Sequence, residues 1–273
     1  MIFLGLIFIG LLVGLLSTFF GVGGGILIVP TLYTFLEFLP PQVVIATSLT
    51  LIFFNSGRNT YNFIKAGVRP KYSYLAPIAI SMLIGVLIGG KLTLIMDSKS
   101  IKLIFSIFVF LIALKTILNK KPAVEGTDWS PELNAKNILL GTLTGLIGGL
   151  ISGMTGLGGG AILIPLFIFI LHIPFRLLSV NSNVCMMVGT FTGMVTYLIQ
   201  PTPTFVFNYR LLEMGQFGYV NFSIVLALFI GSTVSSKIGV NWTQKVNPKL
   251  ANKLFCVLLL IISIKTFVSS QFY

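Results

Sequence analysis

The sequence predicts an all-α polytopic membrane protein made of two inverted repeats of about five transmembrane segments each. Hydrophobic residues make up 55% of its 273 residues and charged residues only 9%, and the mean hydropathy is +1.00. Soluble domains carry roughly 25% charged residues, so this chain lacks the polar side chains needed to cover a water-facing surface. Apolar runs close to the ~20 residues that cross a bilayer recur along its whole length. A glycine-rich motif that occurs twice indicates the repeat.

Ten apolar runs, separated by charged residues, proline and glycine, are the expected membrane segments. In the first half they cover residues 2–20, 25–38, 42–64, 72–91 and 101–118. In the second half they cover residues 137–154, 160–172, 180–200, 216–237 and 250–268. The longest strongly polar stretch lies between the fifth and sixth runs. We therefore expect three parts: a first membrane repeat over 1–118, a polar linker over 119–136, and a second membrane repeat over 137–273.

The motif GVGGGILIVP at 21–30 returns as GLGGGAILIP at 156–165. When residues 14–30 are set over 149–165, eight of the seventeen positions are identical, which is too many for a chance similarity of apolar helices. Further along, the comparison pairs two more positions, Gly85 with Gly231 and Lys91 with Lys237. Because five crossings is an odd number, we expect the second copy to enter the membrane from the opposite face.

The basic residues favour one orientation of the chain. If all ten segments cross, twelve Lys and Arg residues lie in or near the loops on one side of the membrane and five on the other. If the short second segment of each half turns back instead, nine of these basic residues lie on one side and eight on the other. Cytoplasmic loops are enriched in Lys and Arg. The uneven count therefore favours ten crossings, a cytoplasmic linker, and both termini outside.

The two glycine stretches are expected to break helices within the membrane. At 1.5 Å per residue, the segment 25–38 is about 21 Å long, shorter than the ~30 Å hydrocarbon core. Irregular backbone at that depth has to be buried in protein or line a wet cavity. A helix that starts there presents free N–H groups and a positive dipole end, which together bind anions. Glycines in membrane helices also serve close helix packing, and this alternative stays open.

Polar side chains within the apolar runs are further candidates for a binding site. Arg58 lies inside a span near Asn55, and a cation within a span marks a functional site by default. The alternative is that Arg58 reaches toward the loop that begins at Lys65, about 10 Å away along a helix. Asn181 and Ser182 lie in the matching span of the second half, where neutral donors can replace water around an oxyanion.

The sequence argues against several other functions. It has no metal-binding motif, no paired carboxylates and no Walker motif, so we expect no metal, no cofactor and no enzyme activity. The net charge is +12, but the basic residues lie mainly in loops between apolar runs. That distribution indicates contact with anionic lipid and no binding of nucleic acid. No acidic residue lies in the middle of a span, which argues against a cation as the transported solute.

The repeated pattern GxxS-x3-GxGGG-x4-P, followed by ATSL at 46–49 and GVLIGGKL at 85–92, resembles the TauE/SafE family. The resemblance covers nearly the whole chain. It implies a bacterial inner-membrane permease for sulfite or small organosulfur anions such as sulfonates. It also implies candidate substrate-binding residues in the motif and at the starts of the following spans. These are Ser17, Gly21, Gly23, Gly24, Gly25, Thr47 and Ser48, with Ser152, Gly156, Gly158, Gly159, Gly160, Asn181 and Ser182. Asn55 and Arg58 join them from their position in the span.

We therefore expect a secondary transporter, working as an exporter by alternating access. The helix N-termini after the glycine turns would hold a small oxyanion, and Arg58 would supply positive potential. Its partners would be a sulfite-like anion and the lipid bilayer, and the sequence leaves the oligomeric state open. The alternatives are an anion channel, or a membrane scaffold or enzyme subunit that transports nothing.

Overall fold

The computed structural model describes residues 2–36, 38–118, 134–203 and 210–245, with single positions between 257 and 268. Within these ranges the chain is mostly helical, as the sequence predicts. The helices of the first half are α1 (Ile2–Phe20), α2 (Gly25–Phe35), α3 (Pro41–Lys65), α4 (Tyr72–Ile95) and α5 (Ser98–Leu118). The second half contains α6 (Ala135–Thr155), α7 (Gly160–Phe169), α8 (Phe175–Leu198), α9 (Arg210–Met214) and α10 (Phe222–Lys245). Most of the expected linker and of the expected segment 250–268 lies outside the described residues.

The expected segment 216–237 is wrong at its start, where a short hairpin precedes the helix. The strands β1 (Gln216–Phe217) and β2 (Val220–Asn221) pair antiparallel, and the turn between them places Gly218 at φ 54°. The side chain of Asn221 accepts a hydrogen bond from the N–H of Ile224 at 3.1 Å and so caps the first turn of α10. The apolar pattern alone did not reveal the hairpin because its residues are themselves mostly apolar.

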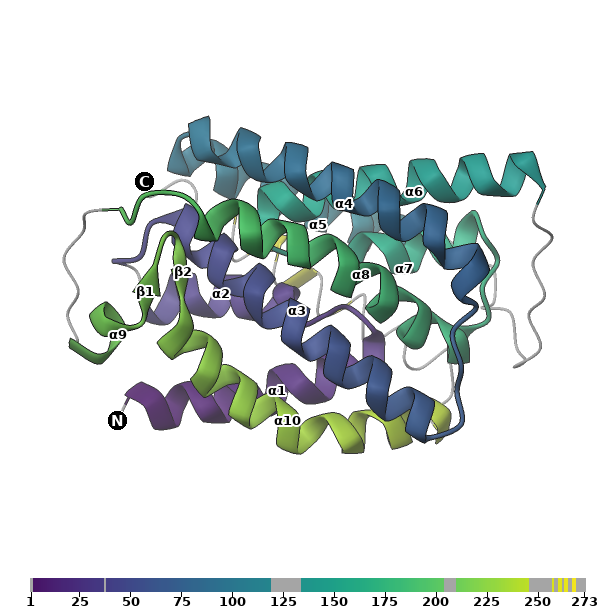
Figure 1. Ribbon diagram of the computed structural model, residues 1–273, viewed down its shortest axis with the longest axis horizontal. Coiled ribbons are helices and arrows are strands. Elements are labelled where there is room, and N and C mark those ends of the chain that lie inside the picture. Colours follow the sequence, from purple (N-terminus) through teal and green to yellow (C-terminus); the bar gives the residue numbers. More distant parts are fainter. Residues whose placement is uncertain are drawn as a thin grey trace.

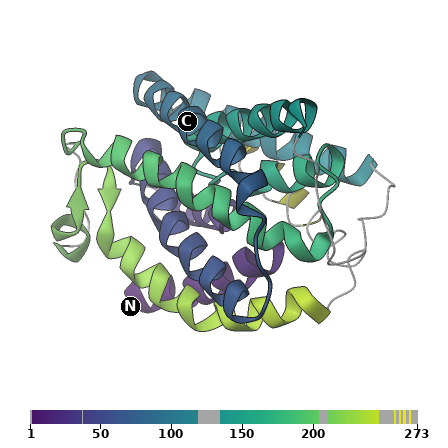
Figure 2. The same cartoon turned by 45° about the vertical axis from the view of Figure 1, so that its right-hand side comes forward.

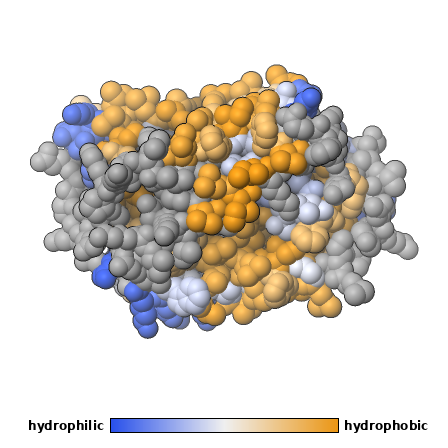
Figure 3. Space-filling model, turned by 180° about the vertical axis from the view of Figure 1, so that it is seen from behind, coloured by the Kyte–Doolittle hydropathy of each residue, from blue (hydrophilic) through white to orange (hydrophobic). Residues whose placement is uncertain are grey.

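Four of the described helices are long and apolar enough to span a membrane: α1, α4, α6 and α10. With 25 and 24 residues, α3 and α8 are also long enough to cross, although they carry buried polar side chains. Large apolar side chains such as Leu4, Phe8 and Leu226 are exposed on the outside. Orange, hydrophobic residues cover the middle of the face in Figure 3, and blue, hydrophilic ones lie toward its ends. This surface is that of a protein embedded in a bilayer.

Helices from the two halves pair with each other on the outside of the molecule. α4 lies beside α6 along one edge and α1 beside α10 along the opposite edge, with α3 and α8 between them (Figures 1 and 2). Both outer pairs approach backbone to backbone. A Cβ atom on Gly145 would collide with the carbonyl of Ile78, and one on Gly10 with the carbonyl of Leu228. Glycine therefore permits the close packing of α6 on α4 and of α1 on α10.

The contacts correct one part of the sequence alignment between the halves. Gly149 of α6 packs on Met82 of α4, and its aligned residue Gly14 of α1 packs on Ser232 of α10. Met82 therefore corresponds to Ser232, and Gly85 corresponds to Ser235 rather than to Gly231. The sequence comparison was out of register by four residues. Since four residues make about one helical turn, the same face of α10 is presented in either register.

Candidate transport site at the glycine turns and an adjacent polar layer

Both glycine motifs form turns that only glycine adopts readily. Gly23 and Gly24 have φ angles of 74° and 90°, and Gly158 and Gly159 have 73° and 82°. Positive φ values in this range strain residues that carry a Cβ atom. Gly24 is the N-cap of α2 and Gly159 is the N-cap of α7, and neither helix has a side-chain cap. The expected short helices after glycine-rich turns are thus present.

The two turns pack directly against each other. A Cβ atom on Gly25 would lie 2.6 Å from the carbonyl oxygen of Gly156, and one on Gly160 would lie 2.5 Å from Cα of Val22. Residues 21–25 and 156–160 are all buried. Close packing is therefore one role of these glycines. An anion at the N-termini of α2 and α7 requires the turns to move apart, so anion binding there stays a prediction.

Two serines tie each turn to the long helix of the other half. Ser48 Oγ of α3 donates to the carbonyl of Gly156 at 2.7 Å, and Ser182 Oγ of α8 donates to the carbonyl of Gly21 at 2.7 Å. Both serines are fully buried. The sequence analysis placed these serines and glycines in one candidate site, and the structure brings them together.

Replacing Ser48 or Ser182 with alanine is expected to lower the unfolding free energy by about 1–2 kcal/mol, because a buried carbonyl loses its donor. Thermal unfolding of the detergent-purified protein measures the change. Ser81→Ala is the matched control, since the buried Ser81 hydroxyl donates only to Ile78 of its own helix at 3.0 Å. Equal changes in all three variants would show that the inter-half hydrogen bonds add nothing.

A layer of buried polar side chains adjoins the turns. Asn55, Asn59 and Asn62 are spaced four and three residues apart and so share one face of α3. Asn59 Nδ2 lies 3.3 Å from both Ser17 Oγ and Asn183 Oδ1, longer than the usual 2.9–3.0 Å of an N–H···O bond. Other bonds complete the layer: Thr18 Oγ1 to Asn59 Oδ1 at 2.7 Å, Ser232 Oγ to Asn55 Oδ1 at 2.6 Å, and Asn62 Nδ2 to Ser236 Oγ at 3.0 Å.

One strong donor in this layer is free within the described part of the chain. Asn55 is 4% exposed, and its Nδ2 has no hydrogen-bond partner there. The hydroxyl of Ser152 and both amide atoms of Asn181 are likewise buried without a described partner. Most buried polar groups in proteins are paired. Such unpaired donors and acceptors therefore point to a ligand or water that occupies the interior.

Among the described residues, the asparagine contacts of this layer have no counterpart at the equivalent positions on the other side of the molecule. Ser48 of α3 and Ser182 of α8 make equivalent contacts, so the two helices can be aligned on these serines. In this alignment Asn55 corresponds to Gly189, Asn59 to Gly193, and Asn183 to Leu49. The equivalent contacts are apolar: a Cβ atom on Gly189 would meet Met82 at 2.7 Å, and one on Gly193 would meet Leu49 at 2.8 Å. On the side of the polar layer, Asn55 contacts Ser232 and Asn59 contacts Asn183. At the equivalent positions on the other side, Gly189 and Gly193 contact the apolar side chains of Met82 and Leu49. The sequence repeat did not reveal this difference.

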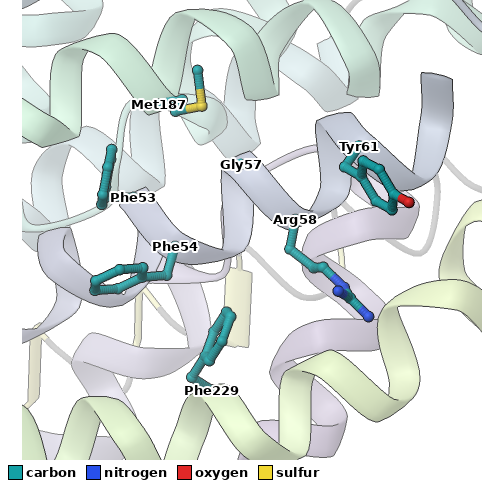
Figure 4. Close-up of a pocket in the computed structure, with 7 residues that line it drawn as sticks. All are labelled: Phe53, Phe54, Gly57, Arg58, Tyr61, Met187 and Phe229. Carbon is teal, nitrogen blue, oxygen red and sulfur yellow. The ribbon is translucent and has the colours of Figure 1, made fainter. Parts of the chain in front are cut away.

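Arg58 does not lie in the polar layer. It belongs to the outward stripe of α3 with Phe54 and Tyr61, whose side chains are exposed. Its Nε atom is buried and has no hydrogen-bond partner among the described residues. Figure 4 shows the side chain in an open cavity of about 490 Å³, whose other lining residues are Phe53, Phe54, Gly57, Tyr61, Met187 and Phe229. Its contact with substrate stays a prediction from the sequence.

Of the predicted site residues, Ser17 and Asn55 therefore lie in the polar layer, and Ser48 and Ser182 hold the turns. Thr47 lies beside β2 and accepts a hydrogen bond from the N–H of Asn221 at 3.0 Å. The residues left out of the predicted site are those that complete the layer: Thr18, Asn59, Asn62, Asn183, Ser232 and Ser236. The helical spacing of Asn55, Asn59 and Asn62 was a usable signal, whereas the serines of α10 gave none.

Acidic side chains are exposed wherever the structure describes them, at Asp97 and Glu213. Asp97 caps α5 by accepting the N–H of Ser100 at 3.0 Å, and hydrogen bonds from Ser100 lower the pKa of this carboxyl group. The described residues hold no cluster of three His, Cys, Asp or Glu side chains that could bind a metal. The described interior thus offers neutral donors and no negative charge.

The family model described as "Sulfite exporter TauE/SafE" matches residues 6–266. The chain belongs to the TauE/SafE family. It is 34% identical to a "Probable membrane transporter protein" of Haemophilus influenzae, over 94% of this chain and 93% of that protein. A "Probable membrane transporter protein" of Methanocaldococcus jannaschii is 29% identical over 89% of this chain and 87% of its own length. No solved structure matches.

This TauE/SafE protein is therefore a membrane transporter, as its helical fold and apolar surface also indicate. A transporter implies a small-molecule substrate and a surrounding lipid bilayer. The names of the relatives do not say which substrate they carry.

Proposed function

We propose that this TauE/SafE protein is a secondary exporter of small oxyanions, namely sulfite or organosulfonates. The buried layer of amide and hydroxyl groups carries the proposal, since it offers donors in an interior without a described carboxylate. Such groups can replace the water around an oxyanion, whereas a cation needs negative charge. The family description, which names sulfite export, supports the same class of substrate.

The proposed site joins the layer to the glycine turns. Asn55 and Asn59 donate to the anion, with Ser17 beside them, and the long bonds of Asn59 are easily exchanged for a charged acceptor. When the turns separate, the N-termini of α2 and α7 add their N–H groups and positive dipole ends. The residues around the turns, including Thr47, Ser152 and Asn181, then complete the path.

Alternating access of two inverted repeats is the proposed mechanism. Equivalent hydrogen bonds between the halves support it: Ser48 donates to the carbonyl of Gly156, and Ser182 donates to the carbonyl of Gly21. The polar layer runs along α3 from the turns toward Lys65, while the equivalent positions of α8, Gly189 and Gly193, make apolar contacts. Rocking one half against the other would close the first side and open the second.

The proposed orientation has residues 1–118 and 137–273 as the repeats, with a cytoplasmic linker and both termini outside. The helix ends support it: α3 and α10 end, and α4, α6 and α8 begin, at the same end of the molecule (Figure 1). Basic residues lie at all of these ends: Lys65, Lys245, Lys71, Lys136 and Arg176. Positive charge concentrates on the cytoplasmic side of membrane proteins.

Uptake of radiolabelled sulfite into proteoliposomes tests the proposed function. We expect saturable uptake that organosulfonates inhibit and a choline salt does not. Sulfite loaded inside should accelerate uptake by counterflow, because a carrier exchanges substrate across the membrane. Uptake that neither saturates nor responds to internal sulfite would indicate a channel. No uptake of any small oxyanion by correctly folded protein would contradict the proposal and favour a scaffold or enzyme subunit.

A further inference from the structure

The outward face of α3 carries a charge that the proposed transport site does not use. Arg58 is half-buried, whereas every other Lys or Arg whose side-chain exposure is described is exposed. Its Nε is buried and unpartnered within that part of the chain, and the two described carboxylates, Asp97 and Glu213, are exposed. A cation within a span is normally paired, and an anionic ligand would supply the partner that the described residues do not.

The surroundings of Arg58 determine what kind of anion fits. Aromatic rings line the cavity, with Phe53 and Phe54 from α3 and Phe229 from α10 (Figure 4). A second cavity of about 430 Å³ continues from Phe54 and Phe229 along α10 to Phe222 and has almost wholly apolar walls. A small hydrated oxyanion would leave both cavities largely unfilled. An apolar chain attached to the anion would fill them.

The depth of Arg58 agrees with the position of a lipid headgroup. Arg58 precedes Lys65, the exposed last residue of α3, by seven residues, which is about 10 Å along the helix. The headgroup layer of a bilayer is roughly 5–7 Å thick on each side, and an arginine side chain can extend over the difference. The cavities extend from Arg58 toward the middle of α3, which is the direction of an acyl chain.

We infer that the groove formed by Phe53, Phe54, Gly57, Arg58, Tyr61 and Phe229 binds an anionic phospholipid. The guanidinium group binds the lipid phosphate, for which its planar donors suit better than an ammonium group. One acyl chain lies against the aromatic rings of α3 and α10. This site is separate from the transport site and does not depend on the identity of the transported anion.

Two variants test the two parts of this interaction, the charge and the apolar groove. Arg58→Gln removes the charge. Gly57→Leu places an apolar side chain in the groove, at a position where an added Cβ atom has its nearest neighbour, Met187 Sδ, at an ordinary 3.5 Å. Lys91→Gln is the matched control, since Lys91 is an exposed cation in the span of α4 that does not line either cavity.

Thermal unfolding of delipidated protein is measured while phosphatidylglycerol or phosphatidylcholine with the same acyl chains is added back. We expect phosphatidylglycerol to raise the unfolding temperature at lower concentration than phosphatidylcholine, because a ligand stabilises the state that binds it. Arg58→Gln should weaken phosphatidylglycerol binding about tenfold and abolish the preference. Gly57→Leu should weaken the binding of both lipids, and Lys91→Gln should behave like the wild type.

Several results would overturn the inference. A wild type without preference for the anionic lipid would do so, and so would an unchanged preference in Arg58→Gln. Glycerol phosphate and sulfite are added as free anions in a separate measurement. If either displaces phosphatidylglycerol from the wild type, or if Arg58→Gln loses sulfite binding alone, Arg58 serves a free anion and the lipid site is wrong.

Discussion

Alanine at Gly25 or Gly160 is expected to prevent stable folding. The added Cβ atom would lie 2.6 Å from the carbonyl oxygen of Gly156 in the first case and 2.5 Å from Cα of Val22 in the second. Overpacking of a core costs about 1–3 kcal/mol and sometimes more. Here the obstacle is the backbone of another turn, which cannot rotate away as a side chain can. We expect a loss of at least about 3 kcal/mol.

The yield of monodisperse protein in detergent and its unfolding temperature measure this effect. Gly5→Ala is the control, because Gly5 lies in α1 with nothing within 4 Å of the added Cβ atom. This change should be neutral or slightly stabilising, since alanine favours the helix more than glycine does. If Gly25→Ala were as stable as Gly5→Ala, the close contact between the turns would not exist in the folded protein.

Leucine at Asn59 or Asn183 is expected to reduce sulfite uptake at least about tenfold. Hydrogen bonds to a charged partner contribute about 1.5–3 kcal/mol each, and a factor of ten corresponds to ~1.4 kcal/mol. Leucine keeps the branched outline of asparagine but is larger and forms no hydrogen bond, so Thr18 and Ser17 lose their bonds to the Asn59 amide in the first variant. The unfolding temperature is expected to fall as well, because buried partners are left unpaired and the core is overpacked, so uptake is compared per amount of correctly folded protein.

Thr196→Val is the control for these two variants. Thr196 corresponds to Asn62 on the apolar side, is 4% exposed, and donates only to Thr192 of its own helix at 2.8 Å. Its uptake should equal that of the wild type. If Thr196→Val lowers uptake as much as Asn59→Leu does, anion binding is not confined to the polar side. Normal uptake in both leucine variants would remove the layer from the transport path.

The variants Arg58→Gln and Asn59→Leu also separate lipid binding from transport. Arg58 lies on the outward stripe of α3, while Asn59 lies on the inward face that contacts α1 and α8. Neighbours in the sequence therefore serve different surfaces, because successive residues of a helix point about 100° apart. A residue that is polar and within a span is not thereby part of the transport path.

The sequence by itself determined the membrane class, the helical architecture and the places where helices break. These follow from local properties: the hydropathy of each run and the positive φ angles that glycine allows at Gly24 and Gly159. The reciprocal use of Ser48 and Ser182 was nearly within reach as well, because Ser48 follows Gly25 by 23 residues and Ser182 follows Gly160 by 22.

Only the tertiary structure decided three features: which residues of α4 and α10 are equivalent in the two halves, the position of the polar layer, and the outward position of Arg58. Each depends on how a helix is rotated about its axis and which neighbour it meets. Hydropathy does not fix this rotation, because α3 has apolar residues on its inner and outer faces alike. The close approach of backbones at glycines such as Gly10 and Gly145 sets the crossings. The separate packing of α3 on α8 decides that Asn59 meets Asn183 while Gly193 meets Leu49.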